Sequence, residues 1–449
     1  MCQADNLARN HFCFSKLNNM ETVLAILLAG GAGERLAPLT RDTAKPAVCF
    51  GGVYRIIDFT LSNCINSDLR RIFILTQYKS LDLIRHIRDG WNILSPELGE
   101  FIETIPPMKR LRDDWYLGTA DAVFQNSQSI AAEQPDLTLI LYADHIYKMN
   151  YREMVDWHNL HHADITIATI QVAPQEAVHF GIAEIDREHR VVGFEEKPRH
   201  GNPARSVFNP ETVSASMGIY VFNTGVLLRL LQEDAQNPAS SHDFGKDVIP
   251  GALEKARVIA YDFQDINDKQ ARYWRDVGTI DAFYEANMDL VAVTPEFNLY
   301  DRHWPIRTRM VQAPPAKFVF AQEGRRMGVA VDSIVAAGCI VSGGRVVRSV
   351  LSTGVRVNSY CEVEYSILMP NVKIGRNSRI RRAIIDTGVE IPESTVIGYD
   401  EEEDRARGYT ITDSGIVVVS GGQPEDRRQE SGDRSQESEA ANVTASSIG

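Results

Sequence analysis

Thr22-Val-Leu-Ala-Ile-Leu-Leu-Ala-Gly-Gly-Ala-Gly-Glu-Arg-Leu36 is the stretch that most constrains the fold of this chain. Its first seven residues are apolar and strand-forming, as in a strand buried on both faces. Glycines then allow backbone amides to approach a ligand, because no Cβ stands in the way. Successive N–H groups favour phosphate oxygens, and Arg35 and Lys45 add positive charge. We predict a nucleotide phosphate site; a tight connection is an equally common role for such a loop.

The sequence of this loop does not match two common classes of glycine-rich loop. A P-loop requires Gly-Lys-Ser/Thr, which occurs nowhere in the chain. A dinucleotide fingerprint counted from Gly31 requires glycine at the position that Leu36 occupies. Leu36, together with the β-helix pattern described below, excludes a simple dehydrogenase.

Length and composition describe an ordinary globular protein. The chain has 449 residues, enough for two or three domains at about 150 residues each. Its net charge of −13 argues against a nucleic-acid partner. The six cysteines include no CxxC pair, which indicates a reduced, cytoplasmic setting. No apolar run approaches the ~18–20 residues of a membrane helix, so we expect no membrane partner.

The two ends of the chain differ from its body. Residues 1–19 are polar and irregular, without a signal-peptide pattern, and form either a disordered extension or untranslated sequence before Met20. Residues 421–449 contain few apolar side chains, so they cannot bury a core and are expected to be disordered.

Short apolar runs alternate with amphipathic segments up to about residue 290. The expected strands are 22–28, 71–76, 137–142, 165–170 and 218–222, and helices are expected over 120–133 and 281–290. This alternation predicts an open, mostly parallel α/β sheet covered on both faces. Ligands of such sheets bind beyond the carboxyl ends of the strands. The glycine loop, Gln77 and Asp144 all follow strand ends.

A different pattern follows a proline-bearing connection over residues 295–315. Aliphatic residues recur every 17 positions in three series: 334, 351, 368 and 385; 340, 357, 374 and 391; 346, 363, 380 and 397. Three short sides per coil, each pointing one aliphatic residue inward, predict a triangular parallel β-helix. Such coils cannot bury their core singly.

Several polar residues in the first part are candidates for phosphate chemistry. Asp144 and Asp276 could hold a divalent cation, although a helix or turn cap is the commoner role of a single aspartate. Lys197 stands beside a proline at a strand end, where a solvated edge is the plainer interpretation. Thr119 could bind a ligand or cap the helix that follows it. His161 and His162 are interpreted as surface residues.

Taken together, the motifs resemble one family, the bacterial glucose-1-phosphate adenylyltransferases (ADP-glucose pyrophosphorylases), over about residues 22–420. The resemblance rests on the following segments: 30–36 (GGAGERL), 44–48 (AKPAV), 50–52 (FGG), 55–59 (RIIDF), 61–66 (LSNCIN), 76–78 (TQY), 115–122 (WYLGTADA), 144–148 (DHIYK), 194–198 (FEEKP), 215–220 (ASMGIY), 243–247 (DFGKD) and 273–279 (YWRDVGT).

The resemblance implies a fold and a domain organisation. The fold is a Rossmann-like, mostly parallel nucleotidyltransferase sheet followed by a C-terminal left-handed parallel β-helix. The expected domains are a disordered extension over 1–19, a catalytic domain over 20–292, a linker over 293–316, the β-helix over 317–420 and a disordered tail over 421–449. A homotetramer and an anionic metabolite effector are also implied.

The implied reaction converts ATP and α-D-glucose 1-phosphate into ADP-glucose and diphosphate, with Mg²⁺, for glycogen or another α-glucan. The matched positions are Gly30, Gly31, Gly33, Gln77 and Thr119 for the nucleotide; Tyr116, Gly181, Glu196, Lys197 and Ser216 for glucose 1-phosphate; Asp144 and Asp276 for the metal; Arg35 and Lys45 for catalysis together with these aspartates; and Gln77 and Trp115 for communication with an effector site.

Two departures from the family pattern bear on this interpretation. Many relatives have glycine where this chain has Ala143, beside the expected metal ligand. Some bind an activator through basic residues where this chain has Asp42 and Thr43, and Thr410 replaces an expected arginine. Arginines 376, 379, 381 and 382 could hold another anion or could be solvated turn charges. Two other hypotheses stay open: use of a different nucleotide, and a noncatalytic regulatory subunit.

Overall fold

The computed structural model describes residues 21–31, 33–107, 115–198, 203–266, 272–322 and 326–421. The extension expected over 1–19 and nearly all of the tail expected over 421–449 lie outside these residues. The chain divides into two compact units. Unit 1 comprises the described residues within 1–32, 57–274 and 300–307, and unit 2 those within 33–56, 275–299 and 308–449.

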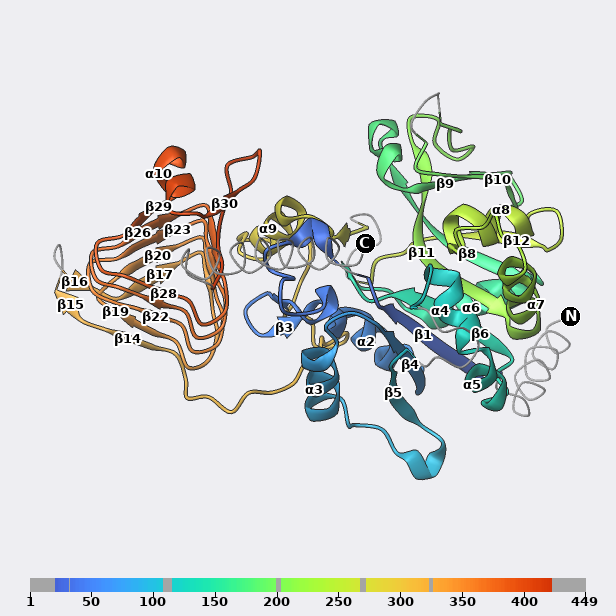
Figure 1. Ribbon diagram of the computed structural model, residues 1–449, viewed down its shortest axis with the longest axis horizontal. Coiled ribbons are helices and arrows are strands. Elements are labelled where there is room, and N and C mark those ends of the chain that lie inside the picture. Colours follow the sequence, from blue (N-terminus) through green and yellow to red (C-terminus); the bar gives the residue numbers. More distant parts are fainter. Residues whose placement is uncertain are drawn as a thin grey trace, which may run out of the picture. The chain divides into compact units, whose positions relative to one another are not determined.

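Unit 1 is organised around one mixed sheet (Figure 1). Its strands are β1 (Val23–Ala29), β4 (Arg71–Thr76), β5 (Phe101–Ile105), β6 (Leu137–Tyr142), β8 (Ile165–Val172), β9 (Gly181–Ile185), β10 (Val191–Glu196), β11 (Val213–Asn223) and β12 (Val258–Asp262). The main path runs β10-β9-β11-β6-β1-β4-β5, with β8 beside β11 and β12 beside β8.

The predicted α/β class is confirmed, and strand direction varies across the sheet. Strands β6, β1, β4 and β5 pair in parallel. The long strand β11 runs antiparallel to β6, β8 and β9. The sheet is therefore parallel around the glycine loop and antiparallel at β11, a detail that the apolar run over 218–222 did not reveal.

Burial on both faces explains why the first strand is almost wholly apolar. Leu24 and Ile26 have no exposed surface and belong to a core cluster with helix residues such as Leu227. Ala25 and Leu27 are equally buried, and alternate residues of a strand point to opposite faces. Hydrophobic burial thus stabilises β1 from both sides and fixes the position of the glycine loop that follows it.

Helices pack along the sheet and lead the chain back between strands. Within unit 1 they are α3 (Leu81–Gly90), α4 (Thr119–Gln125), α5 (Ser127–Ala132), α6 (Tyr151–Leu160), α7 (Thr224–Ala235) and α8 (Ile249–Ala252); α2 (Ile56–Asn66) lies there except for its first residue. The single helix expected over 120–133 is interrupted at Asn126, whose side-chain amide donates to the Ala122 carbonyl at 2.8 Å and the Tyr116 hydroxyl at 3.0 Å.

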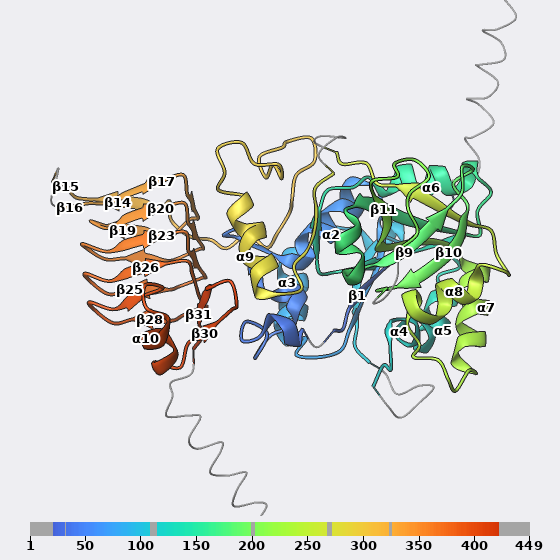
Figure 2. The same ribbon diagram turned by 90° about the horizontal axis from the view of Figure 1, so that it is seen from above.

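Unit 2 contains the predicted β-helix, whose coils stack one upon another in Figure 2. One side is β14 (Lys317–Val319), β19 (Ile340–Ser342), β22 (Arg356–Val357), β25 (Lys373–Ile374) and β28 (Glu390–Ile391). The second is β17 (Val329–Val331), β20 (Arg345–Val347), β23 (Glu362–Glu364), β26 (Arg379–Arg381) and β29 (Val396–Ile397). The third is β18 (Ile334–Val335), β21 (Val350–Leu351), β24 (Ile367–Leu368), β27 (Ala383–Ile385), β31 (Val417–Val419) and β30 (Thr410–Ile411).

The 17-residue period is confirmed except at the first coil. The ten predicted positions from Val346 onward are almost fully buried. Ile334 and Ile340, however, are only partly buried, and the pairing register is Val335 with Leu351 and Val341 with Val357. The inward residues of the first coil are therefore Val335 and Val341, because 16 residues rather than 17 separate it from the second coil.

The remaining elements of unit 2 come from two earlier segments and from two insertions in the β-helix. They are β2 (Cys49–Phe50), β3 (Tyr54–Arg55), α9 (Ile280–Asp289), α10 (Glu401–Ala406) and two short strands of a hairpin, β15 (Ala321–Gln322) and β16 (Arg326–Met327). Asp281 of α9 accepts a hydrogen bond from Thr412 at 3.1 Å, and the Tyr284 hydroxyl donates to the Tyr365 carbonyl at 2.7 Å. These bonds attach α9 to the β-helix. Within the described residues, none of the helices has the length and apolar character needed to cross a membrane.

Candidate active site

The glycine loop leaves β1 beside the residue expected to face the nucleotide base. Ala29 and Thr76 are register partners at the ends of the parallel strands β1 and β4, so the residues after them are neighbours. A Cβ atom built on Gly30 would stand 3.0 Å from Cβ of Gln77, closer than ordinary contact. Nothing lies within 4 Å of the corresponding position on Gly31. The loop is therefore open around Gly31.

The second half of the loop lies in unit 2 and carries the basic residues. Gly33 has a φ of +67°, which favours glycine, and its carbonyl accepts a hydrogen bond from Thr40 at 2.8 Å. A Cβ on Gly33 would lie 3.1 Å from Cβ of Lys45. Glycine at this position therefore lets the loop pack directly against Lys45.

Arg35, Lys45 and Asp276 form a charged group within unit 2. The Lys45 ammonium lies 3.2 Å from Oδ1 of Asp276, and the Lys45 side chain is only 9% exposed. A Cβ on Gly278 would be 3.0 Å from both an Arg35 guanidinium nitrogen and Asp276 Oδ1. Thr279, rather than Asp276, caps α9 by accepting from the Ala282 amide at 3.2 Å. Asp276 therefore does not cap this helix.

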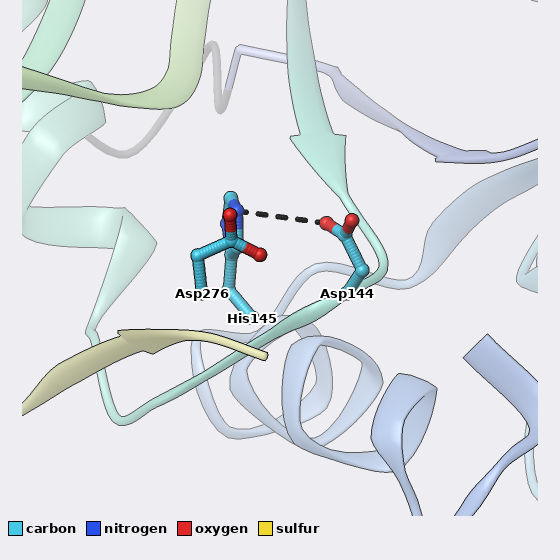
Figure 3. A group of neighbouring side chains, drawn as sticks. All are labelled: Asp144, His145 and Asp276. Atoms are coloured by element: carbon cyan, nitrogen blue, oxygen red, sulfur yellow. Dashed lines mark ion pairs between the residues drawn. The ribbon is translucent and has the colours of Figure 1, made fainter. Parts of the chain in front are cut away.

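The strand pair β7 (His145–Tyr147) and β13 (Trp274–Asp276) carries the acidic candidates. Asp144 immediately precedes β7, and its Oδ1 lies 3.5 Å from Nε2 of His145 (Figure 3). The His145 ring also packs edge-to-face on Trp274, with ring centroids 4.9 Å apart. One ligand atom from each of Asp144, His145 and Asp276 lies within 4.8 Å of the others. These three donors could share a metal ion.

A second group surrounds Glu196 at the end of β10. Glu196 pairs in register with Gly181, and its carboxylate lies 3.2 Å from the Lys197 ammonium. Cβ atoms built on Gly181 and Gly245 would each come within 2.6 Å of Glu196 Oε2, and the Cβ on Gly181 would also lie 2.5 Å from the Phe194 ring. The absence of a side chain at these positions thus lets the Glu196 carboxylate lie close to the backbone. Lys197 has a φ of +49° and is held by a hydrogen bond from its amide to the Phe180 carbonyl at 3.0 Å. A strained backbone at such a position is typical of a binding site.

The remaining predicted sugar residues and Thr119 lie on neighbouring elements. The Ser216 hydroxyl, on β11, accepts a hydrogen bond from the Gly218 amide at 3.3 Å. Thr119 donates to Asp243 and accepts from the Phe244 amide, both at 3.1 Å, so it does not cap α4. Burial raises the pKa of Tyr116 above its ordinary value, which keeps the phenol a neutral hydrogen-bonding group. The ring of Trp115, 56% exposed, stacks on Tyr78 with centroids 5.5 Å apart.

Comparison with known proteins supports the interpretation of both parts of the chain. Residues 24–292 match the family model of nucleotidyl transferases, and residues 314–419 match the GlmU-like C-terminal hexapeptide model. A glucose-1-phosphate adenylyltransferase of Koribacter versatilis is 60% identical over 402 residues, covering 89% of this chain and 96% of the relative. The chain belongs to the glucose-1-phosphate adenylyltransferase family. Relatives of the same name from Rhodopirellula baltica and Paramagnetospirillum magneticum are 56% and 52% identical, each covering 90% of this chain and 91% and 94% of their own lengths.

Some residues of this adenylyltransferase-family site were not singled out from the sequence. His145 belongs to the motif 144–148, but its residue type and spacing alone assign it no role; in the structure its ring lies beside Asp144. Asp243 was likewise unassigned; it binds Thr119 and caps the turn that follows by accepting from the Gly245 and Lys246 amides at 3.0 and 3.1 Å. An aspartate whose carboxylate accepts hydrogen bonds from the amides two and three residues after it is a recognisable capping pattern, and it could have been identified from the sequence.

The departures from the family pattern have distinct surroundings. Ala143 is fully buried and its amide donates to the Leu28 carbonyl at 3.2 Å, so its methyl group lies in the protein interior. Asp42 is exposed in unit 2. Its negative charge acts on Asp386, whose pKa is raised chiefly by burial and further by Asp42. Like charges at this position do not suit a phosphate ligand.

The arginines on the β-helix mostly have protein partners. Arg379 pairs with Glu362 at 3.2 Å and lies over the Tyr399 ring, and Arg382 donates to the Ser414 carbonyl at 3.1 Å. Arg376 lies over the Tyr360 ring. Thr410, which replaces an expected arginine, is exposed at the start of β30. These contacts favour a structural role for most of the cluster.

Proposed function

We propose that this protein transfers the adenylyl group of ATP to α-D-glucose 1-phosphate, forming ADP-glucose and diphosphate. Family membership supports the reaction class and the substrate names. The observation on which the proposal chiefly depends is the group of Arg35, Lys45 and Asp276, with Gly33 of the glycine loop packed against Lys45. Such an arrangement suits a polyphosphate that must be held while one of its bonds is broken.

The donor set also suits a divalent cation, and we propose Mg²⁺. Carboxylate oxygens are the ligands that Mg²⁺ prefers, and they are supplied by Asp144, immediately before β7, and Asp276, the last residue of β13. His145 lies close enough to orient Asp144. When bound, the ion compensates the negative charge of the two phosphorylated substrates.

The chemistry requires positioning more than proton transfer. A phosphate oxygen of glucose 1-phosphate attacks the α-phosphorus of ATP, the bond to the β-phosphate oxygen breaks, and diphosphate leaves. Because the attacking oxygen is already anionic, no general base is needed. The protein must instead bring two polyanions together and neutralise the leaving group. Arg35 and Lys45 carry out this neutralisation at the loop.

The sugar phosphate is assigned to the group around Glu196. Glu196 accepts hydrogen bonds from sugar hydroxyls, and Lys197 binds the phosphate. Tyr116, Gly181 and Ser216 complete the pocket, while Gln77 and Thr119 contact the nucleotide. Burial of Ser216 and exposure of the Lys197 side chain, 55%, suit these two roles.

The direct test is product analysis with purified protein, ATP and glucose 1-phosphate. We expect ADP-glucose and diphosphate in equal amounts, loss of both when a chelator is added, and recovery with Mg²⁺. Absence of turnover in the presence of Mg²⁺ and candidate anionic effectors contradicts the proposal and favours a noncatalytic regulatory subunit.

Substitution of Gly181 by alanine tests the assignment of the sugar group. The added Cβ would lie 2.5 Å from the Phe194 ring and 2.6 Å from Glu196, so both must move. We expect KM for glucose 1-phosphate to rise about tenfold or more, because misplacement by ~1 Å is costly, with KM for ATP unchanged. Gly225→Ala is the matched control, since nothing lies within 4 Å of its Cβ position. Equal effects of the two variants would contradict the assignment.

Assembly and regulation follow the family. We propose a homotetramer regulated by an anionic metabolite, with Gln77 and Trp115 communicating between effector and substrate sites. The stack of Trp115 on Tyr78, the residue after Gln77, supports this role because it joins the two segments physically. Because Asp42 is an exposed carboxylate, we propose that the anion binds elsewhere than at the position of Asp42.

A further inference from the structure

Helix α2, which contains the motif 61–66, has no role in the proposed chemistry, yet several of its polar side chains are buried. Thr60, Ser62 and Asn63 have no exposed surface. A buried polar group is stable only when it is hydrogen-bonded, so the partners of these residues show what they hold. The partners belong to two segments of unit 1: the turn that carries Asp144 and residues Tyr300–Arg307, termed here the strap.

Helix α2 binds the Asp144 turn on both sides. The Thr60 hydroxyl donates to the carbonyl of Tyr142, two residues before Asp144, at 3.2 Å. The Asn63 amide donates to the carbonyl of Tyr147, three residues after it, at 3.1 Å, and Asn63 Oδ1 accepts from the Met149 amide at 3.3 Å. The backbone that carries Asp144 is thus fixed at both ends by one helix.

The strap is bound to helix α2 and to Lys148, the residue that follows β7. The Trp304 indole donates to Asn63 Oδ1 at 2.9 Å, and the Arg307 amide donates to the Ser62 hydroxyl at 2.8 Å. The Lys148 side chain, at the end of β7, has no exposed surface, and its ammonium lies 3.6 Å from Asp301 of the strap. Burial lowers the pKa of Lys148, an effect that Asp301 opposes.

Asn63 therefore connects the strap with the Asp144 turn. Its Oδ1 accepts hydrogen bonds from both Trp304 and Met149, so loss of one bond alters the orientation available to the other. The Lys148–Asp301 ion pair forms a second connection between the same two segments. Partners that orient a metal ligand contribute to metal affinity without touching the metal.

We propose that Asn63, anchored by Trp304 and supported by the Lys148–Asp301 pair, is a positioning residue that holds the Asp144 turn in its metal-binding conformation. This inference rests on the metal site of the proposed function. It adds that the strap, far from Asp144 in the sequence, takes part in the preorganisation of that site.

Hydrogen–deuterium exchange without metal tests the positioning directly. In Asn63→Ala we expect backbone amides of residues 143–149 to exchange faster, and in Trp304→Phe, which retains an aromatic ring, to do so less strongly. The control is Thr138→Val, which removes an equally buried hydrogen bond, to Thr224 at 2.8 Å, away from the turn. Unchanged exchange of residues 143–149 in both test variants overturns the proposal.

Mn²⁺ titration followed by electron paramagnetic resonance tests the consequence. We expect Asn63→Ala to raise the Mn²⁺ dissociation constant about tenfold, a typical effect of removing such a partner, and Thr138→Val to leave it unchanged. The positioning role is overturned if Asn63→Ala speeds exchange of residues 143–149 but leaves Mn²⁺ affinity unchanged, while Asp144→Asn weakens Mn²⁺ binding. If Asp144→Asn itself leaves Mn²⁺ affinity unchanged, the metal site of the proposed function is contradicted, and the exchange result still decides whether Asn63 holds the turn.

Discussion

Replacement of Asp276 by asparagine is expected to lower kcat by about 1000-fold, and Asp144→Asn by a similar factor. Asparagine keeps the size of the side chain but removes the charge that holds a divalent cation and the Lys45 ammonium. A loss of ~4 kcal/mol of transition-state stabilisation corresponds to this factor and is of the size that metal-ion catalysis supplies. Steady-state diphosphate release at saturating ATP and glucose 1-phosphate measures it.

Asp289→Asn is the matched control for Asp276→Asn. Asp289 also lies in unit 2 and pairs with an arginine, Arg275, at 3.4 Å, and the two aspartate side chains are equally exposed, 31%. We expect this variant to retain nearly full activity. Retention of more than about a tenth of kcat in Asp276→Asn would contradict the proposed metal site, because so small a loss is only ~1.4 kcal/mol.

Substitution of Lys197 by alanine is expected to raise KM for glucose 1-phosphate about 100-fold, with KM for ATP unchanged. A charged hydrogen bond contributes up to ~3 kcal/mol, and each 1.4 kcal/mol changes affinity tenfold. Thermal stability should change little, because the Lys197 side chain is 55% exposed. Initial rates over a range of each substrate separate the two KM values.

Lys255→Ala is the control for Lys197→Ala. Its side chain is equally exposed, 56%, and pairs with Glu233 at 2.7 Å, as Lys197 pairs with Glu196 at 3.2 Å. We expect both KM values of Lys255→Ala to match the unmodified enzyme. If Lys197→Ala lowers kcat and leaves KM for glucose 1-phosphate unchanged, Lys197 acts in the transition state rather than in sugar-phosphate binding.

The β-helix could be predicted almost entirely from sequence, because its period arises from one local requirement repeated in every coil. The error at Ile334 and Ile340 occurs at the first coil, where the spacing to the next coil changes by one residue. An aliphatic residue occupies both the predicted and the true inward position, so hydrophobicity could not distinguish them. Pairing with the second coil determines the choice.

The sheet of unit 1 was less completely predictable. Apolar runs located β1, β4, β6 and β8, but strand direction depends on connections that composition does not reveal. Strand β11 runs antiparallel to its neighbours although its sequence resembles that of the parallel strands. The break between α4 and α5 falls at Asn126, whose side chain binds Tyr116, a contact across ten residues.

The residues of the candidate site likewise fall into those that the sequence predicts and those that only the structure reveals. Sequence motifs predict functional roles for Arg35, Lys45 and Asp276, and the structure brings these residues together. The partnership of Asn63 with Trp304 joins residues 241 positions apart, so no local pattern could indicate it. Residue types that carry chemistry can be recognised in a sequence, whereas the buried groups that hold them depend on the tertiary fold.

Nucleotide choice tests the central claim most directly. We would measure diphosphate release from glucose 1-phosphate and Mg²⁺ with ATP, UTP, GTP and dTTP in separate reactions at equal concentration. The adenylyltransferase assignment predicts that ATP supports turnover at least about tenfold faster than each of the others, since base recognition by positioned hydrogen bonds discriminates strongly. Faster turnover with UTP, GTP or dTTP would contradict it, leaving the phosphate chemistry in place but assigning the protein a different product.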